Sequence, residues 1–150
     1  MNSNYDKSKG NGSKYVFDFW NSQKKKINSI RNKFRFFERE IWLVSLGQNI
    51  GVEINGKKDD FLRPVLIYRK YNIDQCFVLP LTTRGKKNIF YYDISSVKFL
   101  KERSFICLSQ GRVIDAKRFF RKLGKISVGQ FVEIKKSAQA MLEPQSPRWP

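Results

Sequence analysis

The sequence predicts a small, mainly β fold with some α structure, a partly open barrel of short strands closed by one C-terminal helix. Two patterns predict it: short apolar stretches separated by turn residues fill the middle of the chain, and an amphipathic stretch follows them. The length of 150 residues is that of one domain. A hydrophobic content of 41%, with 13 Phe, is enough for a core and argues against a disordered polycation.

An extension over residues 1–39 precedes the barrel. Residues 1–14 are polar and rich in Asn, Ser and Gly, which is typical of a flexible lead-in. After them, apolar residues recur at spacings of three, four or seven and predict one face of an amphipathic helix: Phe17, Trp20, Ile27, Ile30 and Phe34. We expect this face to dock on the domain. A helix lying on a membrane surface would have a similar pattern, but the positive charge continues through the rest of the chain.

The barrel is assigned to residues 40–143, and five strands are predicted in its first part. They cover residues 41–44, 63–71, 75–81, 89–95 and 103–109, and residues 112–114 continue the sheet. The second and third strands close a hairpin around a short turn. Residues 47–62 hold three Gly, two Asn and two adjacent Asp, so we expect a long loop there.

The C-terminal part is predicted to be mostly helical. Asp115 is expected to cap a short helix over residues 116–122, and residues 123–126 fit a last edge strand. Ser127, with Gln130 three residues later, resembles a capping box that opens a helix to about Met141. Its apolar positions are expected to face the core: Val128, Phe131, Val132 and Ile134. Residues 144–150 carry three Pro and are expected to form a frayed, disordered tail.

The charge and the missing histidine limit the function. The 30 Lys+Arg against 13 Asp+Glu give a net charge of +17, which points to a polyanion: nucleic acid, a membrane surface or an acidic protein. Without His there is no His-based triad, no imidazole acid–base pair and no common type of zinc site. No common zinc site is therefore expected, and we expect no cofactor.

The cysteines and the apolar runs indicate the compartment. Cys76 and Cys107 lie in apolar strand patterns and are expected to be small buried hydrophobes, not a disulfide framework or a metal site. The longest apolar runs are far too short to cross a bilayer, and no export signal is visible. We expect a cytoplasmic protein in a reducing environment, with no membrane partner.

Four short segments, in their order and spacing, resemble one known family. They are Glu40–Trp42 leading to Gly47, Gly51 and Glu53; Arg63–Ile67; Leu79–Thr83; and Leu108–Asp115 followed by Arg121–Ser127. Together they resemble the MazF/PemK toxins of type II toxin–antitoxin systems, from about Glu40 to Lys136. The basic extension resembles that of a subgroup of this family.

The resemblance implies both a fold and an activity. The fold would be an SH3-like barrel of the CcdB/MazF type with a C-terminal helix, usually in a homodimer. The activity would be that of a metal-independent endoribonuclease toxin, which cuts single-stranded RNA at short sequences and leaves a 2′,3′-cyclic phosphate and a 5′-OH. An acidic antitoxin protein would neutralise it. Two other functions remain open: an SH3-like module that binds nucleic acid without cutting it, and a CcdB-like inhibitor of gyrase.

The catalytic residues follow from the same resemblance. The family's catalytic Arg matches Arg63, and its catalytic Thr matches Thr82. When the RNA 2′-OH attacks the adjacent phosphate, a fixed cation and hydrogen-bond donors must meet the growing negative charge. Relatives that use a His and an acidic residue are excluded, because the chain has no His and carries Ser109 at the acidic position. Without the resemblance, Arg63 would be a solvated strand end, and the Thr82–Thr83 pair would be turn material.

Further candidates could bind the RNA. Thr83 is given a supporting role, and Gln110 could either read a base edge or satisfy backbone groups. The candidate contacts in the long loop and after the third strand are Gln48, Asn49, Glu53, Arg84, Lys86 and Lys87. Ordinary loop polarity or a solvated charge run would explain these equally simply. Phe90, Tyr91 and Tyr92 could stack on bases or pack in the sheet. Gly111 replaces a commonly apolar position and would loosen the strand or mark a bulge.

Overall fold

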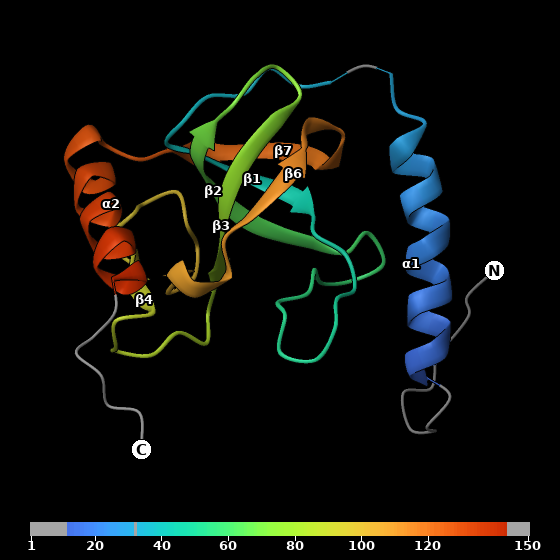
Figure 1. Ribbon diagram of the computed structural model, residues 1–150, viewed down its shortest axis with the longest axis horizontal. Helices are drawn as coiled ribbons and strands as arrows, with labels where there is room; N and C mark the ends of the chain where they lie inside the picture. The colour runs from blue at the N-terminus through green and yellow to red at the C-terminus, as the bar shows by residue number, and fades with distance from the viewer. Residues whose placement is uncertain (1–11, 32, 144–150) are drawn as a thin grey trace.

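The structure, a computed structural model, describes residues 12–31 and 33–143 and is built around one antiparallel sheet (Figure 1). The sheet order is β4-β5-β3-β2-β1-β7, with β6 paired to β3. The strands of the described chain are β1 (Glu40–Ser45), β2 (Leu62–Lys70), β3 (Gln75–Thr82), β4 (Tyr91–Asp93), β5 (Phe105–Cys107), β6 (Arg112–Asp115) and β7 (Phe119–Lys125). The predicted mainly β, partly open barrel is confirmed.

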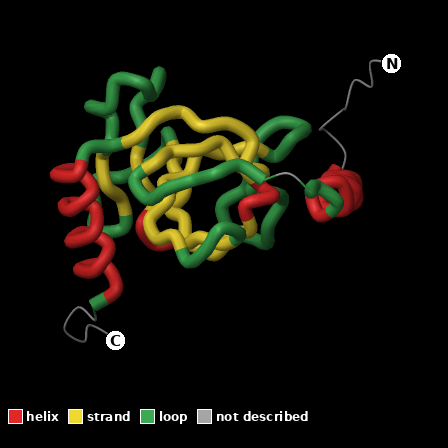
Figure 2. Tube along the Cα trace, turned by 90° about the horizontal axis from the view of Figure 1, so that it is seen from above, coloured by secondary structure: helices red, strands yellow, loops and turns green. Residues whose placement is uncertain are grey.

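Two α-helices lie on opposite sides of this sheet, as two perpendicular views agree (Figures 1 and 2). Helix α1 (Gly12–Asn28) precedes the strands, and α2 (Val128–Leu142) follows them. Two 3₁₀ helices flank β6: η1 (Leu108–Gln110) and η2 (Ala116–Arg118). Neither α-helix, as far as the chain is described, is long and apolar enough to cross a membrane.

The strands separate two hydrophobic cores, because successive side chains of a strand point to opposite faces. The first core lies on one face and contains Phe36, Trp42, Val44, Val65, Ile67, Cys76, Val78 and Phe119. The second core lies under α2 and contains Ile41, Leu66, Leu79, Leu81, Ile106, Phe131, Ile134 and Ala138. Each of β1, β2 and β3 contributes to both cores, so these strands are the centre of the fold.

A buried carboxylate joins the start of β1 to its neighbours. Glu40 accepts hydrogen bonds from the Trp42 indole N–H (2.8 Å), the Phe37 backbone N–H (3.0 Å) and Lys122 Nζ (2.6 Å). Burial favours the neutral acid, but these hydrogen bonds outweigh it and lower the pKa of Glu40. Glu40 therefore stays charged and ties β1 to β7.

The helix predicted over residues 116–122 is wrong. Asp115 does cap, since its carboxylate accepts the Lys117 backbone N–H at 2.8 Å, but η2 ends at Arg118 and β7 begins at Phe119. Strand β7 pairs with β1, and the Phe119 ring stacks on Trp42 at 5.1 Å. The backbone groups on the open edge of β1 need partners, and this pairing outweighs the local helical preference.

Strands β4 and β5 are shorter than predicted. The Asn88 side chain accepts the Phe90 N–H (2.9 Å), and the Asp93 side chain accepts the Ser95 N–H (2.9 Å). These two side-chain turns bound β4 at both ends. After Cys107 the chain turns into η1, so the predicted strand over 103–109 ends early.

Helix α2 is confirmed with its cap, but two of its predicted core residues are wrong. The Ser127 hydroxyl accepts the Gln130 backbone N–H at 3.1 Å. Phe131 and Ile134 are buried as expected, whereas Val128 and Val132 are 62% and 45% exposed. The buried face continues instead to Ala138, at the helical spacing of three and four residues.

Helix α1 is shorter than the predicted stripe, but it docks on the domain as expected. It ends at Asn28, so Ile30 and Phe34 lie beyond it. Within the stripe, Trp20 is buried, whereas Phe17 is exposed. Residues 12–14, expected in the lead-in, belong to α1. The remainder of that lead-in and the tail 144–150 lie outside the described residues.

Candidate active site

The structure brings Arg63 and Thr82 together at one end of the β2–β3 ladder. Val65 lies opposite Pro80, and continuing this antiparallel register by two residues places Arg63 opposite Thr82. Both residues line one open cavity of about 300 Å³. Thr83 lines the same cavity and is exposed. The predicted catalytic pair is therefore adjacent in space.

Arg63 is a nearly buried cation without an acidic partner. Its side chain is only 8% exposed, and its guanidinium donates to the carbonyl oxygens of Asn55 and Leu81, the latter at 2.9 Å. Among the described residues, its second terminal nitrogen Nη2 has no hydrogen-bond partner, and no carboxylate pairs with it. Burial lowers the pKa of Arg63 from its ordinary value, but an arginine remains protonated in proteins. Such a cation is suited to bind an anion.

The Thr82 hydroxyl is oriented by the backbone that follows it. Its oxygen accepts the Arg84 N–H at 3.2 Å. A hydroxyl that accepts in this way keeps its own O–H available to donate. The site therefore offers two kinds of donor, a charged guanidinium and a neutral hydroxyl.

Other cations that line the cavity were not predicted. They are Lys57, Lys101 and Arg121. Arg121 lies in β7 opposite Leu43 of β1, in the segment that was predicted to be helical. The burial pattern of β7 does not alternate as in a half-buried strand, so no local signal marks it, and its place beside β1 depends on the tertiary fold. Glu102 is the acidic residue of the lining.

The loop over residues 47–62 is ordered by its own side chains. The Asn49 N–H donates to the Asn55 side chain at 2.6 Å, and the Asn49 amide donates to Ile54 O at 2.8 Å. The Glu53 carboxylate accepts the Ile50 N–H at 2.9 Å. Since Asn55 O accepts from Arg63, this loop also closes over the guanidinium. In this structure, Asn49 and Glu53 therefore hold the loop in shape.

Gln110 fastens the same loop to the barrel. Its side-chain oxygen accepts the Ile54 N–H at 2.6 Å, and its nitrogen donates to Val52 O at 3.0 Å. Two roles were considered for Gln110, and its contacts in the structure fit the second one, in which it satisfies backbone groups. Arg112 adds a hydrogen bond to the Asn49 side chain at 3.3 Å.

Gly111 lies between η1 and β6, where space is tight. A Cβ at this position would lie 2.3 Å from the Phe77 ring and 2.9 Å from Leu79. The glycine therefore permits close packing against β3 and does not loosen a strand.

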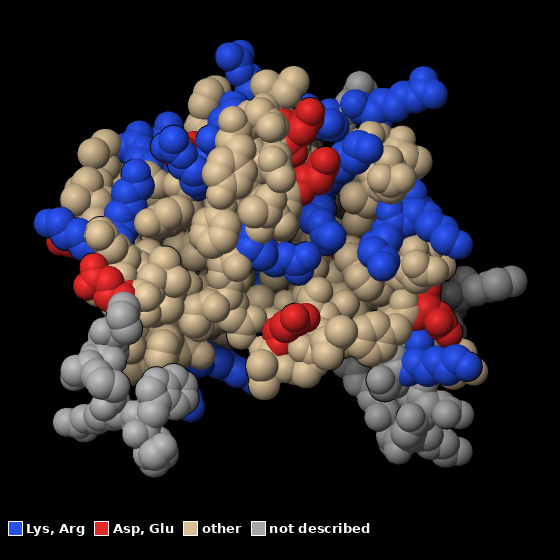
Figure 3. Space-filling model, viewed as in Figure 1, with Lys and Arg blue, Asp and Glu red and all other residues tan. Residues whose placement is uncertain are grey.

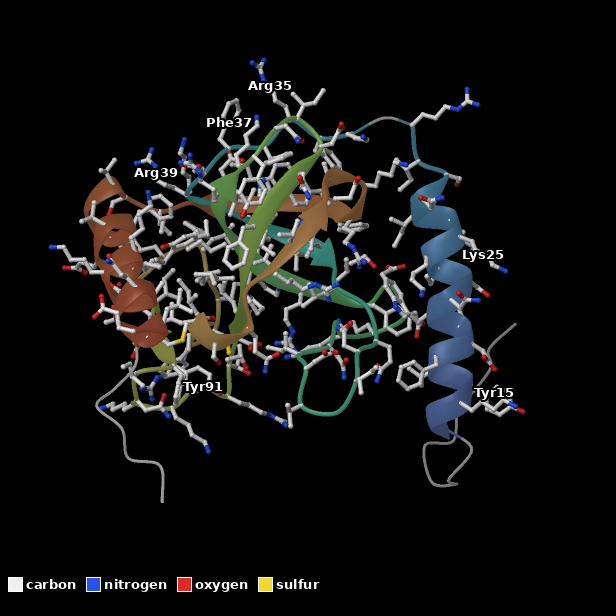
Figure 4. The ribbon with its side chains drawn as sticks, in the orientation of Figure 1. Tyr15, Lys25, Arg35, Phe37, Arg39 and Tyr91 are labelled. Atoms are coloured by element: carbon white, nitrogen blue, oxygen red, sulfur yellow. The ribbon has the colours of Figure 1, made fainter. Side chains whose placement is uncertain are left out.

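The remaining candidates do not line the cavity that holds Arg63 and Thr82. Gln48 is half-buried at the start of the loop, whereas three cations are exposed in the segment after β3: Arg84, Lys86 and Lys87. Phe90 is exposed, and the Tyr92 hydroxyl donates to Glu133 of α2 at 2.8 Å. Figure 4 places Tyr91 near the end of α2, on the side of the barrel away from α1.

The two cysteines are single buried thiols. Cys76 and Cys107 are buried and free, as expected. Burial, followed by the charge of Asp115, raises the pKa of Cys76 to about 12, so it is not a thiolate at neutral pH. Residues 12–31 and 33–143 contain no group of three His, Cys, Asp or Glu that could hold a metal ion.

Known structures share this fold at low sequence identity. The Mycobacterium tuberculosis toxin MazF-mt6 is 19% identical with a TM-score of 0.55, over 69% of this chain and 95% of that one. An endoribonuclease in complex with its cognate antitoxin, from a mycobacterial species, is 13% identical with a TM-score of 0.56, over 77% and 99%. MazF from Deinococcus radiodurans is 15% identical with a TM-score of 0.56, over 73% and 97%.

The family assignment rests on the sequence. No curated protein sequence matches the chain. The family model described as the PemK-like, MazF-like toxin of type II toxin–antitoxin systems matches residues 38–142, which is more than two thirds of the chain. The chain therefore belongs to the PemK-like, MazF-like toxin family of type II toxin–antitoxin systems.

Proposed function

We propose that the chain is a toxin that cleaves single-stranded RNA without a metal, leaving a 2′,3′-cyclic phosphate and a 5′-OH. One observation carries the proposal: Arg63 is a nearly buried cation without a carboxylate partner among the described residues, and it lines the same open cavity as Thr82. A buried charge is normally paired. A phosphate group of the substrate would supply the missing anion.

The reaction is a transesterification within the RNA strand. The 2′-OH gives up its proton to water as its oxygen forms a bond to phosphorus, the bond to the 5′-oxygen breaks, and the leaving 5′-oxygen takes up a proton from water. Arg63 Nη2 and the Thr82 hydroxyl can each donate to a non-bridging oxygen, where the negative charge grows. Because arginine stays protonated, we assign Arg63 to charge stabilisation and not to proton transfer.

RNA can reach Nη2 of Arg63 from the open cavity, but it would have to displace part of the loop 47–62 to engage Nε as well. The Asn55 carbonyl occupies Nε of Arg63, and a phosphate oxygen is a stronger acceptor because it is charged. Movement of the loop would free the polar groups of Gln48, Asn49, Glu53 and Gln110 for contacts with RNA. Thr83 is a further candidate contact.

The cations that follow Thr82 suit the phosphates on either side of the cleaved bond. Arg84, Lys86 and Lys87 are exposed in the segment directly after β3. Contacts of this kind position a strand but do not read its sequence. They would therefore raise the affinity for RNA in general.

The partners follow from the charge and from the relatives. One solved relative is described as an endoribonuclease in complex with its cognate antitoxin. An acidic antitoxin segment would complement the net charge of +17 and block the cavity. We propose that the toxin acts as a homodimer in the cytoplasm.

Incubation of the protein with a long single-stranded RNA in excess EDTA tests the activity. The native chain should produce defined cuts, with fragments that carry a 5′-OH and a cyclic phosphate. Arg63→Ala should lower the cleavage rate by about 100-fold or more, and Thr82→Ala by about 10-fold to 100-fold. Arg69→Ala is the matched control, because Arg69 lies at the other end of β2 and is exposed.

The other functions give different results in the same experiment. RNA that is bound but not cut by the native chain would favour a binding module. A native chain that neither binds nor cuts the RNA would favour an inhibitor of a protein target such as gyrase. Normal cleavage by Arg63→Ala would overturn the assignment of the site.

A further inference from the structure

A groove separates α1 from η2 on the side of the barrel away from α2. It has an open volume of about 430 Å³. Its charged lining comes from both walls: Lys24 and Lys25 of α1, and Asp115, Lys117 and Arg118 around η2. Figure 3 shows Lys and Arg side chains gathered between the sheet and the upper part of α1.

The groove is held open by a fixed contact between its walls. Trp20 of α1 is 5% exposed and packs on the Phe61 ring at 5.0 Å. It also covers Gly47, where φ is +94° and a Cβ would lie 2.3 Å from the indole. Arg118 lies over the Trp20 ring at 5.6 Å, and Lys117 Nζ donates to Asn28 O at 3.0 Å. The two walls are therefore joined at their base.

Positive charge in the groove exceeds negative charge. The Asp115 carboxylate already accepts the Lys117 N–H at 2.8 Å. Within the described chain, neither Lys24 nor Lys25 forms an ion pair. Burial, and after it the charge of Arg112, lowers the pKa of Arg118 from its ordinary value. An anion in the groove would meet the unpaired charges of Lys24 and Lys25.

The groove adjoins the root of the loop that closes the candidate active site. Arg118 Nη1 donates to Ser45 O at 3.0 Å, at the end of β1, and Phe61 lies two residues before Arg63. A nucleic-acid strand that enters the cavity from this side would therefore pass α1. The extension lies where it can contact such a strand.

We propose that the groove between α1 and η2 binds the sugar–phosphate backbone of single-stranded RNA outside the cleaved bond. This inference rests on the proposed function and adds a binding surface to it. Lys24 supplies a phosphate contact inside the groove, and Lys25 lies at its outer rim, as Figure 4 shows by its direction away from the barrel. The contacts are independent of base sequence.

RNA fits this groove better than an acidic peptide does. A peptide interface takes its affinity from apolar anchors in pockets, whereas a phosphate backbone needs only fixed cations. The large apolar residues of the groove are Trp20, whose ring is already packed against Phe61 and Arg118, and the half-buried Ile27. Lys117 is held by its hydrogen bond to Asn28 O, so within the described residues the ammonium groups left to meet an anion are those of Lys24 and Lys25.

A pair of charge-matched variants tests the proposal. Lys24→Gln with Lys25→Gln changes the groove, and Lys14→Gln with Lys26→Gln removes the same charge from the same helix at residues that do not line it. The probes are a labelled single-stranded RNA of about 20 nucleotides and one of about 6. A single-stranded DNA of the longer sequence serves as a third probe, which lacks the 2′-OH and cannot be cut by transesterification.

The groove variant should bind both long probes roughly tenfold more weakly than the control variant at low salt. The slope of log K against log salt should fall in magnitude by about 1.4 with the groove variant, which is about 0.7 for each lost phosphate contact. The short RNA should bind equally to both variants, and the cleavage rate at saturation should not change.

Equal binding of the long probes by the two variants would overturn the proposal. So would a groove variant that binds RNA normally but loses affinity for polyglutamate, because the groove would then serve an acidic protein. Failure of the proposed function would be distinguishable. If the native chain binds the DNA probe through Lys24 and Lys25 but cuts no RNA, the groove proposal stands and the proposed nuclease function fails.

Discussion

The two helices are held to the barrel in opposite ways. Helix α2 places Phe131, Ile134 and Ala138 in the second core, in contact with residues from several strands. Helix α1 is slightly longer, but within its described side chains Trp20 alone is fully buried. One helix is therefore attached by a continuous apolar face. The other is attached mainly by the Trp20 ring, with Phe19 on Phe61 at 5.8 Å and the Lys117–Asn28 hydrogen bond in support.

This difference separates a structural helix from an accessory one. The second core cannot form without α2, so removing its contacts should destabilise the whole barrel. Helix α1 can undock locally, because few apolar contacts oppose it. Its contact residues, Gly47 and Phe61, are the roots of the loop that closes over Arg63. Changes in α1 should therefore affect the site more than the fold.

The largest expected effect tests α2. Ile134→Ala should lower the free energy of unfolding by about 2–5 kcal/mol, because it leaves a cavity in the second core. Denaturant unfolding measures this. Val132→Ala on the exposed face of α2 is the control and should change it by less than about 0.5 kcal/mol. An equal loss of unfolding free energy in the two variants would mean that α2 does not pack on the barrel through the face that carries Ile134.

Trp20→Ala should lower the free energy of unfolding by a smaller amount, about 1–3 kcal/mol. This loss cannot exceed the free energy with which α1 docks on the barrel. The variant should also become sensitive to trypsin at Lys24–Lys26 while the barrel stays intact. Phe17→Ala, a partly exposed aromatic of the same helix, should keep α1 protected. Cooperative loss of the whole fold in Trp20→Ala would show that α1 is as structural as α2.

The smallest effect concerns the hydrogen bond between the Tyr92 hydroxyl and Glu133 of α2. Burial, followed by the Glu133 carboxylate, raises the pKa of Tyr92 to about 12. A raised tyrosine pKa means that the contribution to stability is fully present below the unfolded pKa of about 10 and is lost as the pH rises towards 12. Tyr92→Phe should cost about 0.5–1 kcal/mol at pH 7. In unfolding measurements at rising alkaline pH, the free energy of unfolding of Tyr92→Phe should approach that of the native chain. A difference between the two that stays constant with pH would contradict a stabilising hydrogen bond from Tyr92 to Glu133.

The sequence predicted the parts of the fold that depend on local pattern. Strands β1 to β3 and the Ser127 cap follow from apolar runs, turn residues and capping chemistry. Strand β7 could not be predicted in this way, because its conformation depends on the open edge of β1. Val128 and Val132 were misplaced for a related reason: apolarity does not specify which face of a helix meets the sheet.

The candidate site shows the same division. Arg63 and Thr82 were found from the family resemblance, and their neighbourhood follows from the hairpin of β2 and β3. Lys57, Lys101 and Arg121 join the cavity from three separate segments, so no local pattern reveals them. The contacts of Gln110 depend on where the loop places the Val52 carbonyl and the Ile54 N–H.

The unpaired charge of Arg63 has a consequence for the stability of the fold. Carbonyl dipoles from Asn55 and Leu81 solvate the guanidinium but do not neutralise it. Burial of such a charge opposes folding. Removal of the side chain, however, would leave these two carbonyl oxygens without their donor. Under the proposed function, the barrel gives up stability at the position that would bind phosphate. In an Arg63 variant the relief of the buried charge and the loss of these two hydrogen bonds therefore act on the free energy of unfolding in opposite directions.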